Sequence, residues 1–99
     1  NGIGIIINTH NKMTQKEEDT MCILKYIRDS KKSHISLTEL KQYSGAEPLR
    51  VDAIMYEFYL SRIFQPSAYS FWGIPIEYIV PDESSIKKCE NSFKNKKGK

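Results

Sequence analysis

The sequence has little of what several classes of protein require. It contains two cysteines and two histidines in 99 residues, whereas small secreted domains usually carry several disulfide bonds. Its longest uncharged apolar run covers only residues 3–7, far short of the roughly 20 residues of a membrane-spanning helix. That run is also too short for a signal-peptide core and has no basic flank. We therefore expect one small intracellular domain, cytoplasmic or nuclear, that does not enter a membrane.

Signatures of catalysis and of cofactor binding are also absent. Residues 2–4 lack the third glycine and the following helix of a dinucleotide fingerprint, and no phosphate-binding loop or nucleophile elbow occurs. Cys22 and Cys89 stand 67 positions apart with no clustered histidine, so we expect free thiols and no zinc site. The acidic residues 17–19 stand at the start of a predicted helix, so we interpret them as solvent-exposed residues that complement the helix dipole and not as an acid–base pair for catalysis. We predict no enzyme, metal, cofactor or small-molecule substrate.

The formal charge of +3 is distributed unevenly along the chain. Residues 1–86 carry nine Lys or Arg and eleven Asp or Glu, a net charge of −2. Residues 87–99 carry six Lys and one Glu, a net charge of +5. A lysine-rich tail of this kind can neutralise nucleic-acid phosphates without reading a base sequence. Such tails also occur as solvated ends without any partner.

Hydrophobic periodicity and capping signals predict three helices. The first covers about residues 15–32, because residues 14–17 form a capping box and the apolar positions that follow share one helical face. The second begins at another capping box, residues 36–39, and ends at Ser44 and Gly45, where glycine can take the left-handed cap. The third begins at Pro48 and reaches about Ile63. The residues predicted to be buried in the three helices are Thr20, Ile23, Leu24 and Ile27, then Leu37 and Leu40, then Val51, Ile54, Met55 and Phe58.

After Pro66 the pattern changes to the alternation of a β-strand. Residues 74–80 predict a strand whose half-buried face carries Ile74, Ile76, Tyr78 and Val80. Residues 63–70 supply its partner strand, with a turn at 71–73. Residues 1–13 predict an N-terminal strand or arm. The Lys-rich tail, residues 82–99, contains a possible short helix at 83–93 with Ile86, Cys89 and Phe93 on one face. The fold class is therefore mainly α with a β-hairpin.

The order of elements over residues 14–81 resembles the winged-helix superfamily. The resemblance rests on the helix at 36–45, the tight turn at 45–48, the helix at 51–63 and the hairpin at 64–80, with a brief strand at His34 and Ile35 before them. It implies a winged-helix-like three-helix core with a C-terminal wing, and assigns no subfamily. Most members of this superfamily bind DNA, whereas a sizeable minority are protein-interaction modules.

The leading hypothesis is a DNA-binding module within a transcriptional regulator or larger assembly, with double-stranded DNA as the partner. Residues 48–63 then form the recognition helix, with Arg50 and Tyr56 in the groove. Phosphates are held by Lys41, Lys87, Lys88, Lys94, Lys96 and Lys97. Two observations count against DNA: acidic residues 47, 52 and 57 would face phosphates, and residues 63–80 contain no Lys or Arg.

The alternative hypothesis is a protein-interaction or dimerisation module. Its interface would use apolar residues of the third helix, spaced as in a helix–helix seam, together with the aromatic wing tip. These residues are Leu49, Ala53, Tyr56, Leu60, Phe71 and Trp72. Two further interpretations leave this surface without a partner: the tail (Ile86, Phe93) or residues 3–7 cover the helix, or Trp72 folds back onto the helices. An aromatic tip could also enter a DNA minor groove.

Overall fold

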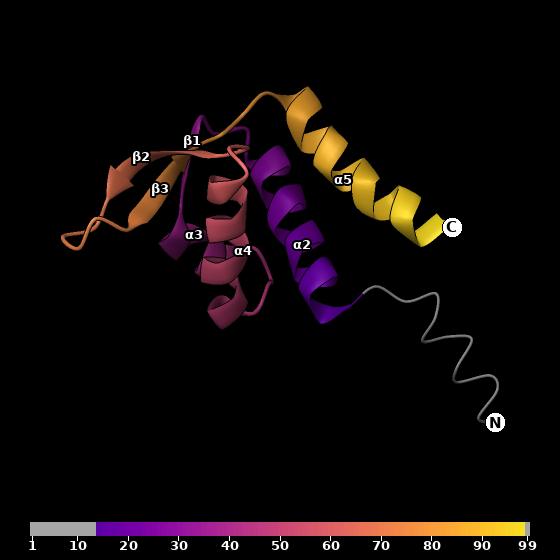
Figure 1. The fold of residues 1–99 in the computed structure, drawn as a ribbon, viewed down its shortest axis with the longest axis horizontal. Helices are drawn as coiled ribbons and strands as arrows, with labels where there is room; N and C mark the ends of the chain where they lie inside the picture. The colour runs from indigo at the N-terminus through magenta and orange to yellow at the C-terminus, as the bar shows by residue number, and fades with distance from the viewer. Residues whose placement is uncertain (1–13, 99) are drawn as a thin grey trace.

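The computed structural model describes residues 14–98, with side chains up to residue 92. The described part is mainly helical, with one small antiparallel sheet (Figure 1), which confirms a mainly α fold with a β-hairpin. The predicted strand at residues 3–7 and the arm at 1–13 lie outside the described residues. The elements are α2 (Gln15–Ser30), β1 (His34–Ser36), α3 (Leu37–Tyr43), α4 (Pro48–Leu60), β2 (Gln65–Tyr69), β3 (Pro75–Ile79) and α5 (Glu83–Gly98).

Helix α2 begins where the capping box predicts. The Thr14 side chain accepts a hydrogen bond from the Glu17 amide, and the Glu17 carboxylate accepts one from the Thr14 amide. The helix ends at Ser30, slightly before the predicted end, because Lys31 takes a left-handed conformation with φ of 59°. Its buried face includes all four predicted residues, Thr20, Ile23, Leu24 and Ile27.

Helix α3 has only half of the predicted capping box. The Ser36 hydroxyl accepts a hydrogen bond from the Glu39 amide. The Glu39 carboxylate turns instead toward α2, where it accepts hydrogen bonds from the Tyr26 hydroxyl and from Nζ of Lys32. The bond to Glu39 raises the pKa of Tyr26 to about 12. A residue predicted to cap its own helix therefore joins α3 to the end of α2.

Helix α4 starts at Pro48, as predicted, after a turn in which Gly45 has a φ of +87°. It ends at Leu60, before the predicted end at Ile63, because the chain turns into β2 through Arg62, whose φ is 65°. The amide of Ile63 donates to the Phe58 carbonyl and closes this turn. The inner face is as predicted: Val51, Ile54 and Met55 are buried and Phe58 packs half-buried against them.

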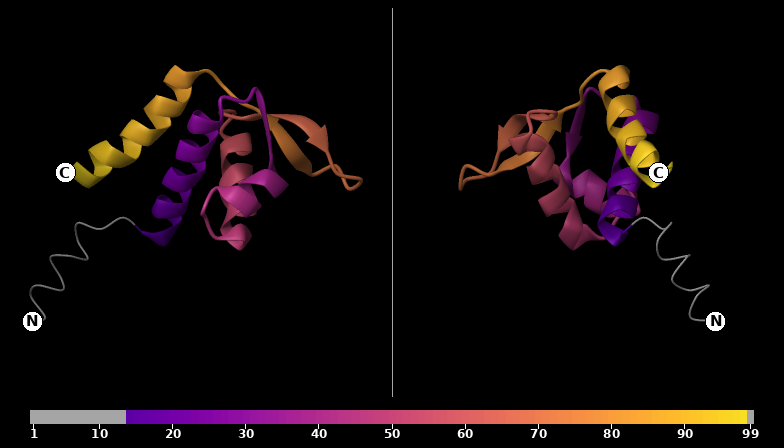
Figure 2. Two further views of the ribbon diagram at one scale, coloured as in Figure 1. Left: turned by 180° about the vertical axis from the view of Figure 1, so that it is seen from behind. Right: turned by 45° about the vertical axis from the view of Figure 1, so that its right-hand side comes forward.

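The hairpin strands and β1 form a sheet in the order β1-β3-β2, with all neighbours antiparallel. Ile35 of β1 lies opposite Tyr78 of β3, and both are fully buried. The hairpin then extends beyond the helices, as both views of Figure 2 show. The predicted half-buried face is therefore wrong at its outer end: Ile74 and Ile76 are exposed because the strand turns the intervening Pro75 inward there, while Tyr78 is buried.

Helix α5 packs beside α2, which stands between α5 and α4 (Figures 1 and 2). It starts at Glu83, as predicted, and runs to Gly98, beyond the predicted end at residue 93. Ile86 is buried in the core, and Arg28 of α2 pairs with the buried carboxylate of Glu90 at 2.6 Å. Among the described helices, none has both the length and the apolar composition needed to cross a bilayer.

Candidate functional site

The outward side of α4 is apolar and open to solvent. We call Leu49, Ala53, Tyr56 and Leu60 the α4 face. Leu49 is 82% exposed, Leu60 61% and Tyr56 45%, and Ala53 is also exposed. The core holds the opposite side of the helix, through Val51 and Met55, so the α4 face is presented on a fixed element.

No described side chain covers the α4 face. Ile86 was one candidate for covering it, but this residue lies beside Ile27 and Val80, on the far side of α2. The other candidates, the Phe93 side chain and residues 3–7, lie outside what the structure describes. The interpretation that Ile86 of the tail covers α4 is therefore wrong.

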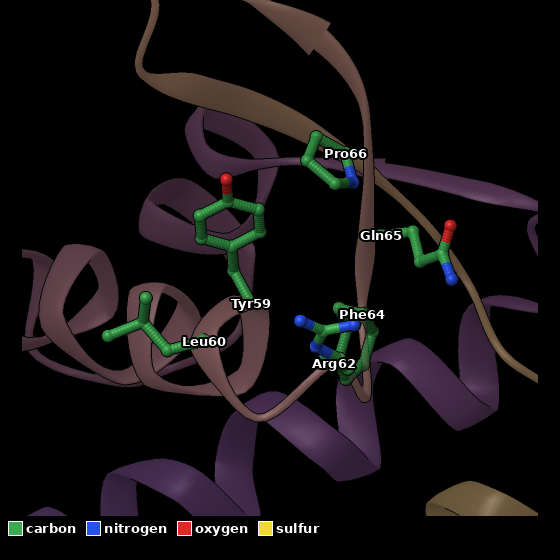
Figure 3. A pocket seen from close by; sticks show the side chains of 6 residues that line it. All are labelled: Tyr59, Leu60, Arg62, Phe64, Gln65 and Pro66. Carbon is green, nitrogen blue, oxygen red and sulfur yellow. The ribbon is translucent and has the colours of Figure 1, made fainter.

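A surface pocket continues the α4 face toward the hairpin. It has a volume of about 380 Å³ and lies where α4 ends and β2 begins. Figure 3 shows Tyr59 and Leu60 on the helix side of the pocket, Gln65 and Pro66 along the strand, and Arg62 and Phe64 between the two. Leu60 belongs both to the α4 face and to this pocket, which continues onto the first strand of the hairpin and also carries the polar Arg62 and Gln65.

The tip of the hairpin carries the most exposed aromatic side chains of the described residues. Phe71 is 93% exposed and Trp72 is 81% exposed, and their rings pack edge to face at 5.2 Å. The Ser70 hydroxyl accepts hydrogen bonds from the Trp72 and Ile74 amides, which holds the turn. The interpretation that Trp72 folds back onto the helices is therefore wrong, since the turn directs both rings outward.

Three cationic side chains near α4 are paired with acids of the same chain. Nζ of Lys41 lies 2.9 Å from Asp52, and Nζ of Lys16 lies 2.7 Å from Glu57. Arg50, the predicted base reader, donates through Nε to the buried carboxylate of Asp19. Asp52 and Glu57, two of the three acids expected to repel phosphates, are thus compensated, and Lys41 and Arg50 are engaged in ion pairs.

Asp19 corrects one expectation from the sequence. The acidic residues 17–19 were expected to be solvent-exposed, but Asp19 is only 3% exposed. Burial by itself would raise the pKa of Asp19, but hydrogen bonds from Arg50 and Gln15 hold it below the ordinary value. The signal was present in the sequence, because Asp19 stands four residues before Ile23 and one before Thr20, beside the buried face of α2.

The predicted nucleic-acid contacts do not meet on one surface. Arg50, Tyr56 and Lys41 lie on or near α4, whereas Lys87 and Lys88 are exposed on α5, beyond α2 (Figure 1). Lys94, Lys96 and Lys97 continue along the same helix, where the structure describes only the backbone. The protein-interaction residues of α4, by contrast, share one face of one helix.

The described residues offer few other groups that could bind a metal ion or act as a nucleophile. Cys22 and Cys89 are free, half-buried thiols, and burial raises the pKa of Cys89. In the part of the chain that the structure describes, no three His, Cys, Asp or Glu side chains gather closely enough to hold a metal ion. Sequence reasoning also missed Tyr43, which is exposed on α3.

No protein-family model, curated protein or solved structure matches this chain.

Proposed function

We propose that this chain is a non-enzymatic protein-interaction module of the winged-helix type, which binds a protein through the α4 face and the hairpin tip. The element order supports the winged-helix resemblance: α4 takes the place of the recognition helix and the β2–β3 hairpin the place of the wing. The short strand β1 pairs with β3 and closes the sheet against the helices.

The exposed α4 face is the observation that carries this proposal. A helix that reads bases in the major groove offers polar or cationic side chains to the base edges, whereas this one offers Leu49, Ala53, Tyr56 and Leu60. Contiguous exposed apolar surface marks interaction sites. Tyrosine and tryptophan are enriched among the residues that dominate protein–protein binding energy, and Tyr56 and Trp72 are both accessible.

The charges around α4 support the same conclusion. Affinity for DNA comes largely from cations that replace the counterions of phosphates. Lys41, Lys16 and Arg50 already face Asp52, Glu57 and Asp19. Binding phosphate through Arg50 would require breaking its pair with the buried Asp19, whereas docking a protein on the apolar face would not.

The proposal is tested by comparing variants in protein capture. The immobilised full chain selects proteins from a lysate, and each candidate is identified, purified and bound again to the wild type, Leu60→Glu and Tyr56→Ala. Lys25→Glu, at an exposed position of α2, is the control for added negative charge, because it makes the chain even more negative than Leu60→Glu does. We expect Leu60→Glu to weaken binding at least tenfold, about 1.4 kcal/mol, and Lys25→Glu to leave it unchanged. A partner that binds Leu60→Glu as well as the wild type would contradict the proposal.

DNA binding is the second candidate function, and the lysines of α5 favour it. Lys87 and Lys88 are exposed there, and they would hold phosphates without reading a base sequence. Mobility shifts with a mixed-sequence duplex test this function. The expected result is salt-sensitive binding that Lys87→Gln combined with Lys88→Gln weakens for every sequence alike. An intact chain without duplex affinity at low salt would exclude this function.

A further inference from the structure

The residues of the α4 face are arranged symmetrically about the middle of the helix. Two large residues, Leu49 and Leu60, lie near its ends. The small Ala53 and the large Tyr56 lie between them. When two such helices cross in opposite directions, Leu49 of one faces Leu60 of the other. Ala53 then faces Tyr56, so each large ring meets a small residue. One surface can thus complement itself about a two-fold axis.

The charges beside the α4 face select the antiparallel direction. The four residues of the α4 face follow one another at intervals of four, three and four positions. Arg50 and Glu57, seven residues apart, lie on one side of this row, and Asp52 lies on the other side. In an antiparallel pair, Arg50 of each copy lies beside Glu57 of the other, so opposite charges meet twice. A parallel pair would instead set Asp52 beside Glu57 of the other copy, so like charges would meet twice.

The groups required for these contacts are accessible. The side chains of Lys16 and Glu57 are both more than half exposed, so their own ion pair contributes little to the free energy of unfolding. Glu57 can therefore approach a second cation without loss of the fold. Arg50 donates a hydrogen bond to Asp19 through Nε, but its side chain is 42% exposed. Arg50 is therefore also accessible to a carboxylate of a second chain.

From this symmetry and charge pattern we infer that the partner of the α4 face is a second copy of this chain, held by an antiparallel pair of α4 helices. The inference rests on the proposed function and names its partner. Helix α4 is about 20 Å long, so its face alone is smaller than the roughly 800 Å² per partner of a stable complex. We therefore expect a weak dimer, with a dissociation constant in the micromolar range or above.

The first experiment measures oligomeric state. Sedimentation equilibrium of the full chain, from about 10 µM to about 1 mM, should show reversible dimerisation. Leu60→Glu and Tyr56→Ala should each weaken the dimer at least tenfold, whereas Lys25→Glu should leave it unchanged. Circular dichroism checks that each variant folds, which is expected because positions 56, 60 and 25 are exposed.

The second experiment tests the direction of the pair by disulfide trapping. In a full chain carrying Cys22→Ala and Cys89→Ala, Leu49→Cys and Leu60→Cys are made separately, then oxidised alone and mixed. The antiparallel pair predicts a crosslink between the two variants in the mixture. Leu49→Cys alone should give none, because its two copies lie about 16 Å apart along the helices, beyond the reach of a disulfide.

The outcomes separate this inference from the proposed function. A chain that stays monomeric at every concentration and forms no crosslink overturns self-association. The proposed function then stands if another protein still binds in a Leu60-dependent manner, and falls if none does. A crosslink of Leu49→Cys with itself overturns the antiparallel arrangement. Reversible dimers with the mixed crosslink, lost in Leu60→Glu, support the inference.

Discussion

At the scale of single residues, the contact between Asp19 and Arg50 joins two helices that lie far apart in the sequence. The carboxylate is buried at the start of α2, and the guanidinium reaches it from the first turn of α4. Gln15 donates a second hydrogen bond to the same carboxylate. Arg50 therefore has a structural role in orienting α4, whatever the α4 face binds.

Arg50→Ala should destabilise the fold by about 2 kcal/mol, because Asp19 would remain buried without its cation. Chemical denaturation with urea measures this change in the free energy of unfolding. Lys25→Ala, at an exposed position, is the control and should change stability by less than about 0.5 kcal/mol. Equal stability of the two variants would show that the ion pair contributes nothing.

Asp19 should also make stability depend on pH. Its pKa is lower in the folded protein than its ordinary value, so its contribution is fully present above the unfolded pKa of about 4. The contribution is lost as the pH falls through the folded pKa. Urea midpoints measured between about pH 6 and pH 2 should therefore fall on acidification, and fall less steeply in Asp19→Asn. Asp29→Asn, an exposed change on the same helix, should keep the wild-type slope; an unchanged slope in Asp19→Asn would contradict this assignment.

At the scale of elements, the turn between α3 and α4 determines how α4 leaves the core. Gly45 holds this turn with a φ of +87°, and a Cβ at this position would meet no atom within 4 Å. The requirement for glycine is therefore one of backbone conformation and not of space. The hairpin turn has the same character at Gly73, where φ is +82°.

Gly45→Ala should lower the free energy of unfolding by about 1 kcal/mol, which is the cost of the left-handed conformation for an ordinary residue. Gly45→Asn should cost less, because asparagine adopts this conformation more readily. Urea denaturation of both variants measures the difference. If the two substitutions cost the same, backbone conformation is not the cause.

The exposed hairpin tip should contribute to binding without contributing to folding. Phe71→Ser and Trp72→Ser should each change stability by less than about 0.5 kcal/mol, because both side chains are almost fully exposed. Phe64→Ala, at the buried base of the hairpin, should cost about 3–5 kcal/mol. Thermal denaturation compares the three variants, and a large loss in Trp72→Ser would show that this ring packs against the chain.

At the scale of the whole molecule, α5 belongs to the same core as the preceding helices. Ile86 lies in the core cluster with Ile27, and Arg28 pairs with Glu90 across the contact between α2 and α5. Lys87 and Lys88 are exposed on α5, and α4 lies beyond α2 from that helix (Figure 2). A charged surface and an apolar surface are thus kept apart by one helix.

Ile86→Ala should destabilise the whole domain by about 2–4 kcal/mol, because it removes a buried side chain between two helices. Ile79→Ala is the matched control, since Ile79 is 44% exposed and should cost clearly less. A single cooperative unfolding transition, shifted as a whole by Ile86→Ala, is the expected calorimetric result. A transition left unchanged would show that α5 folds independently of the core.

Local signals in the sequence were sufficient to predict the elements that the structure describes and most of their inner faces. Thr14 and Pro48 start helices, Gly45 and Gly73 allow turns, and the spacing of apolar residues identifies the buried sides. These signals act between residues within a few positions of one another, so they can be read without knowledge of the fold.

Only the tertiary structure decided which apolar and charged residues remain available for binding a partner. The exposure of Leu60 and Trp72 depends on which elements pack beside them, and the pairing of Arg50 with Asp19 joins residues 31 positions apart. Contacts between distant segments also determine that α5 packs against α2 and not over α4. Burial and ion pairing are set by contacts between distant segments, which periodicity along the chain does not encode.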